Sequence, residues 1–584
     1  MARLAFRRPS MERFRRQLAS VDAMPQLCLL GIFAGVLTGG VMVALRLLLQ
    51  LGALFLMPGD DPEAFEALPP LARALMPLIA VALIGLWLWP QPRRTLRMGI
   101  GHVIERLAYH QGKMPFRNWL NQWWVGVISV IGGLSAGREG PAVHLGSAAS
   151  SWIGTRLRLP HNSLRVLVGC GTAAAISASF NTPIAGVIFA MEVVIMEYTI
   201  AGFMPVILAS TMGALVSWAV YGSEPAFSVP PLELSSLRDL PWIVLTALII
   251  GVMAGVFVRL AKGHALVARL PFALRLLMIG SVTGAIAWFY PEVQGIGYDS
   301  LAQTLNAPMA LDTLLVLAVI KLSLTALCLA GGIQVGVIGP LLVSGAAAGA
   351  VMGMMGGAWL PSIVTTPDLY AVLGMAAMMA AALQAPLAAL LALLELTRNA
   401  AIMLPGMLAV VVAVLTARQF CGCQGFFMST LNQLGQHPLQ QPLMQALSRV
   451  AVPAVMERNL VRTPRLIDHD RARSLLGSKP TWLVIVDDNR NKPPLAMKAA
   501  SLARVLDDEA WLAEHERIDL EEVPGERLDL APVPLQATLS EAFDTLNESG
   551  VDALYVEHMT APMIRKISGI ITREAIENYY RRKR

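Results

Sequence analysis

The chain has 584 residues, of which 55% are hydrophobic and only 15% are charged, and its mean hydropathy is +0.57. Soluble proteins carry about 25% charged residues, so this composition excludes a soluble enzyme and a disordered chain. The formal net charge of +6 is concentrated in basic segments at the two ends, 1–24 and 581–584. We interpret them as segments held in the cytoplasm rather than as a surface that binds nucleic acid.

The distribution of charge divides the chain into a membrane part and a soluble part. Residues 451–584 hold 41 of the 86 charged residues, although they make up less than a quarter of the chain. We therefore predict a cytoplasmic segment at 1–24, a transmembrane domain at 25–435, a linker at 436–450 and a soluble regulatory domain at 451–584.

Long apolar runs in the membrane part predict an all-α polytopic membrane protein. Runs long enough to cross about 30 Å of hydrocarbon as helices include 71–89, 243–260 and 311–327. Other apolar runs are shorter, at 166–178, 184–191 and 387–394. We expect these shorter helices to stop inside the membrane, where buried protein or a water-filled cavity satisfies their backbone groups.

An internal repeat organises the membrane part into two halves. The string at 171–185 recurs 203 positions later at 374–388, and Glu192 and Glu395 coincide at the same offset. A Gly/Pro interruption precedes each copy, at 137–141 and at 336–340. Paired interruptions in two halves are typical of transporters and channels built from repeats.

The interruptions combine residues suited to holding an anion. Each places glycines directly before a Pro at a predicted helix start, and a third glycine pair lies in 99–103. The first turn of a helix presents free N–H groups and the positive end of the helix dipole. We expect several such helix starts to converge and stabilise a dehydrated anion.

Glu139 lies between the glycines of the first interruption. A carboxylate there would compete with a permeant anion for the same N–H groups, so its protonation or outward movement would open the path. We predict that Glu139 is a gate and a proton acceptor. The alternatives are an ion pair with Arg138 or an ordinary interfacial carboxylate.

These motifs resemble the CLC family of chloride channels and chloride/proton exchangers over residues 25–435. The family motif G-K/R-E-G-P is intact at 137–141, the pattern N-x-P-x-A-G…E is present at 181–192, and G-x-F-x-P appears at 336–340 with Ile338 in place of Phe. The resemblance implies a homodimer with one pore per subunit, each subunit built from two inverted halves with broken helices. It also implies the anion-binding residues Gly99, Ile100, Gly101, Arg138, Gly140, Gly336, Val337, Ile338 and Phe427.

Departures from the family pattern bear on mechanism. The family serine and tyrosine that donate hydroxyls to the central anion correspond here to Ile100 and Phe427, so we expect weaker central binding. The position of the internal proton-relay glutamate is Val193, with Glu192 and Glu197 as candidate substitutes. We therefore favour a gated chloride channel. The alternatives are a chloride/proton exchanger with a non-standard proton route and a fluoride-exporting relative.

The soluble part resembles a degenerate pair of CBS modules, roughly 452–510 and 525–580. Strands are predicted at 482–486, 553–556 and 567–571, with helices beside them. The nucleotide pattern of such modules keeps Gly569 and Thr572 but has Ala575 where the ribose-binding acid would stand. We therefore expect a regulatory domain that binds no adenine nucleotide.

The remaining predictions concern localisation, activity, ligands and three individual residues. We expect an inner-membrane protein with both termini in the cytoplasm, no enzymatic activity, no metal and no cofactor, with chloride and the lipid bilayer as partners. A membrane-embedded enzyme would need a ligand cluster such as H-E-x-x-H, and the sequence has none. Lys321 is expected to pair with Glu192 or Glu395, while His102 and His144 are expected to be structural.

Overall fold

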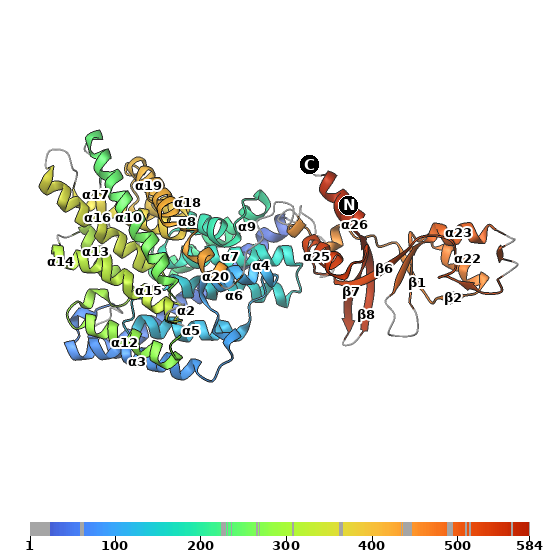
Figure 1. The fold of residues 1–584 in the computed structure, drawn as a ribbon, viewed down its shortest axis with the longest axis horizontal. Coiled ribbons are helices and arrows are strands. Elements are labelled where there is room, and N and C mark those ends of the chain that lie inside the picture. The colour runs from blue at the N-terminus through green and yellow to red at the C-terminus, as the bar shows by residue number, and fades with distance from the viewer. Residues whose placement is uncertain are drawn as a thin grey trace, which may run out of the picture. The chain divides into compact units, whose positions relative to one another are not determined.

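The computed structural model describes residues 24–582 apart from the gaps 59–62, 224–228, 230–231, 235, 264–266, 268, 307–308, 361–365, 434, 436–446, 487–493, 509–510, 513–514 and 562–563. The predicted basic segment, except Met24, and most of the predicted linker lie outside the described residues. Two compact units result (Figure 1): a helical unit of 24–156 and 164–438, and an α/β unit that includes 157–163 and the chain from 439 onward.

The first half of the helical unit runs from α2 to α9. Its helices are α2 (Met24–Leu56), α3 (Pro70–Leu88), α4 (Gly99–Tyr109), α5 (Phe116–Ile131), α6 (Glu139–Arg156), α7 (His161–Phe180), α8 (Pro183–Phe189) and α9 (Ile200–Tyr221). A π-helical turn at Ala190–Ile195 extends α8. The expectation that the run at 166–178 stops midway was wrong, because it is part of the 20-residue helix α7.

The second half repeats this succession of long and short helices. Its helices are α10 (Leu240–Ala261), α12 (Phe272–Ala287), α13 (Tyr298–Asn306), α14 (Leu311–Val316), α15 (Leu322–Ala330), α16 (Ile338–Trp359), α17 (Pro367–Leu383), α18 (Pro386–Thr397), α19 (Met403–Cys421) and α20 (Phe426–Gln433). A π-helical turn joins α14 to α15. Within the described residues, 8 helical segments are long and apolar enough to cross a membrane, which confirms the predicted polytopic class.

Close approach between glycines positions the same helix pair in each half. A Cβ added to Gly171 on α7 would lie 2.3 Å from the carbonyl oxygen of Gly146 on α6. A Cβ added to Gly374 on α17 would lie 2.3 Å from the carbonyl oxygen of Gly345 on α16. Small residues at such crossings let helix backbones touch, which is how helices associate in membranes. The coincidence of Gly171 with Gly374 in the repeat therefore has a packing cause.

The two halves are also inverted with respect to each other. Glu192, after α8, accepts hydrogen bonds from the N–H groups of Leu387 (3.2 Å) and Ala388 (2.8 Å) at the start of α18. Glu395, near the end of α18, accepts in turn from Ile184 (2.9 Å) and Ala185 (2.7 Å) at the start of α8. Each short helix ends where the other begins, so α8 and α18 are antiparallel.

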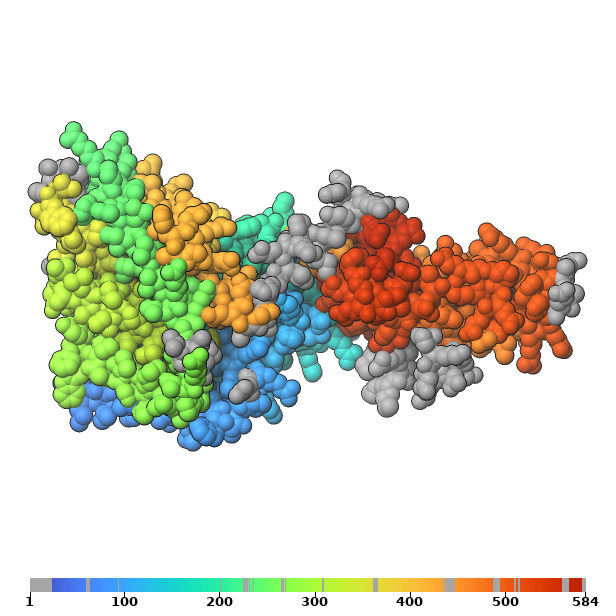
Figure 2. Space-filling model, viewed as in Figure 1, coloured from blue at the N-terminus to red at the C-terminus, as the bar shows by residue number. Residues whose placement is uncertain are grey.

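Long helices flank these short ones. Helix α9 packs on α2, and α19 packs on α10. In the space-filling view, α10 (green) and α19 (orange) lie side by side (Figure 2). The outer sides of such helices keep large apolar residues exposed, among them Leu248, Val252, Val411 and Leu415.

The α/β unit contains one six-stranded sheet of order β1-β3-β4-β6-β7-β8. Its strands are β1 (Leu460–Thr463), β3 (Trp482–Ile485), β4 (Leu495–Lys498), β6 (Arg527–Pro534), β7 (Ala553–Ala561) and β8 (Ile564–Thr572). Helices α22 (His469–Gly477), α23 (Ala499–Leu506), α25 (Leu539–Ser549) and α26 (Arg573–Arg582) pack beside it, with separate apolar clusters in its two parts. The predicted strands and the helices beside them are present.

Candidate anion path and its gate

The two Gly/Pro interruptions meet at one point between the halves. The N–H of Gly137 donates to the carbonyl of Gly336 (2.8 Å), and the N–H of Gly336 donates to the carbonyl of Gly137 (3.0 Å), which forms an antiparallel bridge. A Cβ on Gly336 would lie 2.4 Å from the Gly137 oxygen, and a Cβ on Gly140 would lie 2.9 Å from the Cα of Gly336. Glycine is required here because the backbones touch. Helices α6 and α16 both begin beside this bridge.

The Glu139 side chain is fully buried at this point. One carboxylate oxygen, Oε2, accepts a hydrogen bond from the N–H of Gly339 in the first turn of α16 (3.3 Å). The other oxygen, Oε1, accepts from the hydroxyl of Tyr298 (2.5 Å). The carboxylate therefore occupies the start of a helix, where N–H groups and the helix dipole favour an anion.

Arg138 is not the ion-pair partner of Glu139. Its guanidinium donates to the carbonyl of Ser179 (2.9 Å) and lies 5.1 Å from the centre of the Tyr298 ring. No ion pair joins Arg138 to Glu139, both of which are described. The alternative interpretation of Glu139 as half of an Arg138 ion pair therefore does not hold.

Two N–H groups expected to bind the anion already have acceptors. The N–H of Gly336 is used in the bridge, and the N–H of Gly99 donates to the side-chain oxygen of Gln122 (2.6 Å). Ile100 and Gly101 lie in the first turn of α4, and Ile100 is buried. Val337 precedes α16 and Ile338 begins it, both of them buried. Phe427 on α20 is buried with its ring against Phe426 (centroids 5.3 Å apart), so it offers no hydroxyl.

Comparison with known proteins identifies this arrangement. The family described as "Voltage gated chloride channel" matches residues 91–418, more than half of the chain. The chain belongs to this family, the CLC family. A ClcB-like chloride channel protein of Ralstonia nicotianae is 34% identical over 363 residues, which cover 60% of this chain and 84% of the relative. The H(+)/Cl(-) exchange transporter ClcA of Vibrio cholerae is 28% identical, covering 56% of this chain and 73% of the relative.

Solved CLC structures share the fold. A slow cyanobacterial Cl-/H+ antiporter has a TM-score of 0.61 at 23% identity and covers 70% of this chain and 97% of its own. A CLC-type fluoride/proton antiporter has a TM-score of 0.59 at 22% identity, covering 69% and 97%. A eukaryotic CLC transporter has a TM-score of 0.60 at 18% identity and covers 95% and 99%, so the likeness in fold extends into the α/β unit.

The candidate proton-relay residues of this CLC chain have other partners or no charge. Val193 is buried in the π-helical turn after α8. Glu192 caps α18, and Glu197 lies 3.5 Å from the guanidinium of Arg165. The sequence expectation that Lys321 pairs with Glu192 or Glu395 was wrong. The Lys321 ammonium is buried and donates to the carbonyls of residues 292–295 at 3.1–3.3 Å.

His102 and His144 form a buried pair. Nδ1 of His102 on α4 lies 2.9 Å from Nε2 of His144 on α6, and the two rings stack. The contact joins the helix that carries Ile100 to the helix that carries Glu139. The structural role expected for the two rings stays a prediction.

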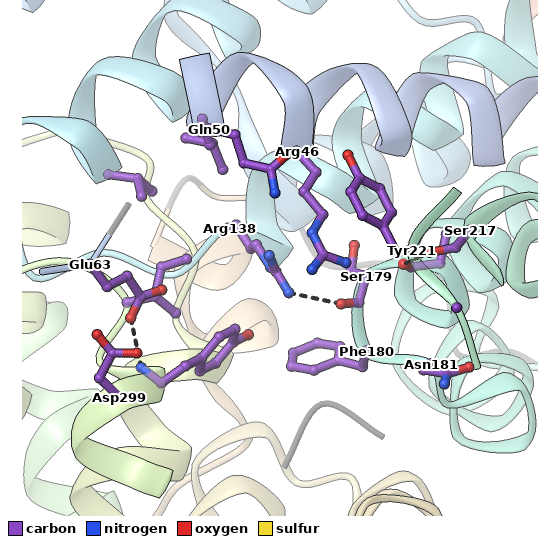
Figure 3. A pocket seen from close by; sticks show the side chains of 16 residues that line it. Arg46, Gln50, Glu63, Arg138, Ser179, Phe180, Asn181, Ser217, Tyr221 and Asp299 are labelled. Carbon is purple, nitrogen blue, oxygen red and sulfur yellow. Dashed lines mark hydrogen bonds between the residues drawn. The ribbon is translucent and has the colours of Figure 1, made fainter. Parts of the chain in front are cut away.

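A cavity of about 360 Å³, drawn in Figure 3, lies beside Tyr298, whose hydroxyl donates to Glu139. Tyr298 lines it, as do Arg46 from α2 and Arg138. Arg46 stacks 3.8 Å above the Tyr221 ring. Other polar residues of the wall are Gln50, Glu63, Ser179, Asn181, Ser217 and Asp299. We call this cavity the vestibule.

Sequence reasoning missed Tyr298, Glu63 and Arg46. A signal for Tyr298 was present, because the Gly-Ile-Gly string of residues 99–101 recurs at 295–297, immediately before Tyr298. No comparable pattern marks Glu63 or Arg46. Arg46 lies on α2 and Glu63 follows that helix, so both are far from Glu139 in the sequence.

Proposed function

We propose that this protein exchanges chloride for protons, with Glu139 as the group that links the two. The observation that carries the proposal is the Glu139 carboxylate at the start of α16, held by the Gly339 N–H and the Tyr298 hydroxyl. An anion can take that place only after the carboxylate leaves, and protonation weakens its hold on both donors. Proton uptake and anion passage therefore depend on one side chain. The ClcA relatives, which are named exchange transporters, support the same activity.

The second candidate is a gated chloride channel, the function that the sequence favoured. Val193 supports it, since an apolar side chain cannot relay a proton, and the ClcB-like relative is named a chloride channel protein. An exchanger needs a proton route that avoids position 193. Ile100 and Phe427 replace the two residues that would donate hydroxyls to the central anion. The preference for chloride or fluoride is therefore measured in the experiment described next.

The test is chloride efflux from proteoliposomes with internal pH recorded at the same time and the membrane potential clamped by valinomycin. An exchanger takes up protons against their gradient when chloride leaves. Chloride efflux without proton movement would contradict exchange and support the channel. Replacing chloride by fluoride in the same vesicles measures the anion preference.

The matched variant is Glu139→Gln, which keeps the shape of the side chain but cannot ionise. We expect it to pass chloride with no coupled proton movement. If proton coupling survives in Glu139→Gln, Glu139 is not the linking group. Glu233→Gln, a change at an exposed glutamate, serves as the control for a general effect of charge.

We further propose a homodimer in a bacterial inner membrane with both termini cytoplasmic. The family resemblance supports the homodimer, and the basic segments at the two ends support the cytoplasmic termini. The α/β unit then acts as a CBS-type regulatory pair. A Cβ added to Gly569 would lie 2.7 Å from the sulfur of Met456, and the Thr572 hydroxyl accepts from the N–H of Ala575. The position of the ribose-binding acid is Ala575, which supports a tail that binds no adenine nucleotide; isothermal titration with ATP and AMP would test this.

A further inference from the structure

The Tyr298 hydroxyl is set rigidly against the gate. Tyr298 begins α13 directly after Gly295 and Gly297, which both have positive φ (61° and 87°) and turn the chain toward Glu139. The Tyr298 ring has Phe180 (centroids 6.1 Å apart) and the Arg138 guanidinium (5.1 Å from the ring centre) as neighbours. With these neighbours in place, the hydroxyl donates to the Glu139 carboxylate.

The turn before Tyr298 is itself held by charges. Oε2 of Glu63 accepts hydrogen bonds from the N–H groups of Gly297 (2.9 Å) and Tyr298 (2.7 Å). The Lys321 ammonium holds the carbonyls of residues 292–295 just upstream. One carboxylate and one ammonium thus fix the segment that carries the hydroxyl, and Glu63 faces the vestibule (Figure 3).

We propose that Tyr298 is a positioning residue that latches Glu139 in the closed position, with Glu63 holding the latch from the vestibule side. The proposal rests on the gating role of Glu139, but it does not depend on whether chloride movement is coupled to protons. The Gly339 N–H alone, at 3.3 Å, is a weak hold. The short bond from Tyr298 to an ionised acceptor is the stronger of the two contacts.

The latch gives a role to a hydroxyl that lies beside Glu139 rather than on the expected anion path. Ile100 and Phe427 offer no hydroxyl along the expected anion path, whereas Tyr298 offers one to the gate. A hydroxyl on the path stabilises the passing anion. A hydroxyl on the gate stabilises the carboxylate that blocks it. The chain is therefore expected to conduct slowly until the carboxylate is protonated.

Removing the hydroxyl gives a defined shift in pH dependence. A hydrogen bond to an ionised group is worth a factor of about ten or more in an equilibrium. In Tyr298→Phe, the carboxylate loses that stabilisation, so flux rises at a higher external pH than in the parent, by about one pH unit. The charged and titratable groups that share this environment, and are unchanged by the substitution, are Arg46, Glu63, Arg138, Tyr221, Asp299 and Lys321.

The experiment measures chloride flux in proteoliposomes as a function of external pH for the parent, Tyr298→Phe and Tyr221→Phe. Tyr221 is the matched control, because its ring lines the same vestibule but its hydroxyl has no hydrogen-bond partner among the described residues. We expect Tyr298→Phe to shift the profile and Tyr221→Phe to leave it in place. An unshifted Tyr298→Phe profile would overturn the proposal.

A double variant separates latching from a merely structural effect. In a Glu139→Gln background there is no carboxylate to hold, so adding Tyr298→Phe should not change the pH profile further. A shift that persists in that background would also overturn the latch. Should Tyr298→Phe fail to yield a monodisperse protein, Glu63→Gln, which weakens the same turn from the other side, is expected to shift the profile in the same direction. Failure of the exchange proposal would show separately, as an absence of proton movement.

Discussion

Glu63 gives the protein a titratable group near neutral pH outside its membrane-spanning helices. Burial and the neighbouring Asp299 carboxylate raise the pKa of Glu63 to about 7. With a raised pKa, the proton is bound below about pH 7 and lost as the pH rises through that value. Only the ionised form is a strong acceptor for the N–H groups of Gly297 and Tyr298. Acidification through pH 7 therefore loosens the turn that carries Tyr298.

We expect Glu63→Gln to mimic the protonated form. Its chloride flux should exceed that of the parent above about pH 8 and match it below about pH 6, because the parent's Glu63 is already neutral there. Flux in proteoliposomes at the two external pH values is the measurement. Glu233→Gln, a change at an exposed glutamate, is the control and should follow the parent at both pH values. Equal flux of Glu63→Gln and the parent at the alkaline pH would contradict this role for Glu63.

The glycine bridge between the halves makes a sharp prediction of its own. In Gly336→Ala, the new Cβ would lie 2.4 Å from the Gly137 carbonyl oxygen, a backbone atom that cannot move without separating α6 from α16. We expect loss of chloride flux and a free energy of unfolding lower by about 2 kcal/mol or more. Gly357→Ala on the same helix meets nothing within 4 Å and should retain both flux and thermal stability. Normal flux in Gly336→Ala would show that the bridge is dispensable.

At the scale of elements, the reciprocal caps on α8 and α18 are a structural device of the repeat. Glu192 and Glu395 each place a carboxylate on two N–H groups of the opposite helix. Both N–H groups would otherwise lie unpaired at a helix start inside an apolar unit. The coincidence of these glutamates in the sequence repeat is therefore explained by capping, without a proton-relay role.

Two substitutions test this interpretation. Glu192→Gln and Glu395→Gln should each lower the melting temperature of the detergent-purified protein by a similar amount, corresponding to about 1–2 kcal/mol. Proton coupling per chloride should be unchanged in both, as measured in proteoliposomes. If Glu192→Gln abolished proton coupling while Glu395→Gln preserved it, Glu192 would be a relay after all. Glu197→Gln removes the carboxylate beside the Arg165 guanidinium and tests the other candidate relay residue in the same way.

At the scale of the whole molecule, the sequence predicted those features that depend on local chemistry or on the internal repeat. The hydrophobic runs, the paired interruptions and the position of Glu139 at a helix start all follow from spacing along one segment. The polytopic helical class and the strands of the α/β tail followed in the same way, whereas the inversion of the two halves was implied by the resemblance to the CLC family. These features need no knowledge of distant contacts.

The contacts of Glu139 could not be predicted, because they join residues far apart in the chain; the recurring Gly-Ile-Gly string marks Tyr298 but not its partner. The hydroxyl of Tyr298 reaches Glu139 across 159 positions, and Glu63 reaches the Tyr298 N–H across 235. Lys321 turned to four carbonyls rather than to a carboxylate, since backbone oxygens can satisfy a buried ammonium as well as an ion pair can. Periodicity carries no record of such contacts.

These distant contacts make the two halves interdependent. Glu139 of the first half accepts hydrogen bonds from Tyr298 and Gly339 of the second half. Gly137 pairs with Gly336, and Glu192 caps the start of α18. A half expressed alone would leave a buried carboxylate and several helix starts unpaired, at a cost of roughly 1–3 kcal/mol for each group. That sum is comparable to the whole stability of a typical domain.

We therefore expect a chain cut between α9 and α10 to fold only when both pieces are present. Co-expressed pieces should copurify, give one monodisperse peak and support chloride flux, whereas either piece alone should aggregate. The uncut protein carrying an inserted flexible segment at the same place is the control for disturbance of the connection. A single piece that is monodisperse and conducts chloride would contradict the argument, because it would show that one helix start and one glutamate suffice for the path.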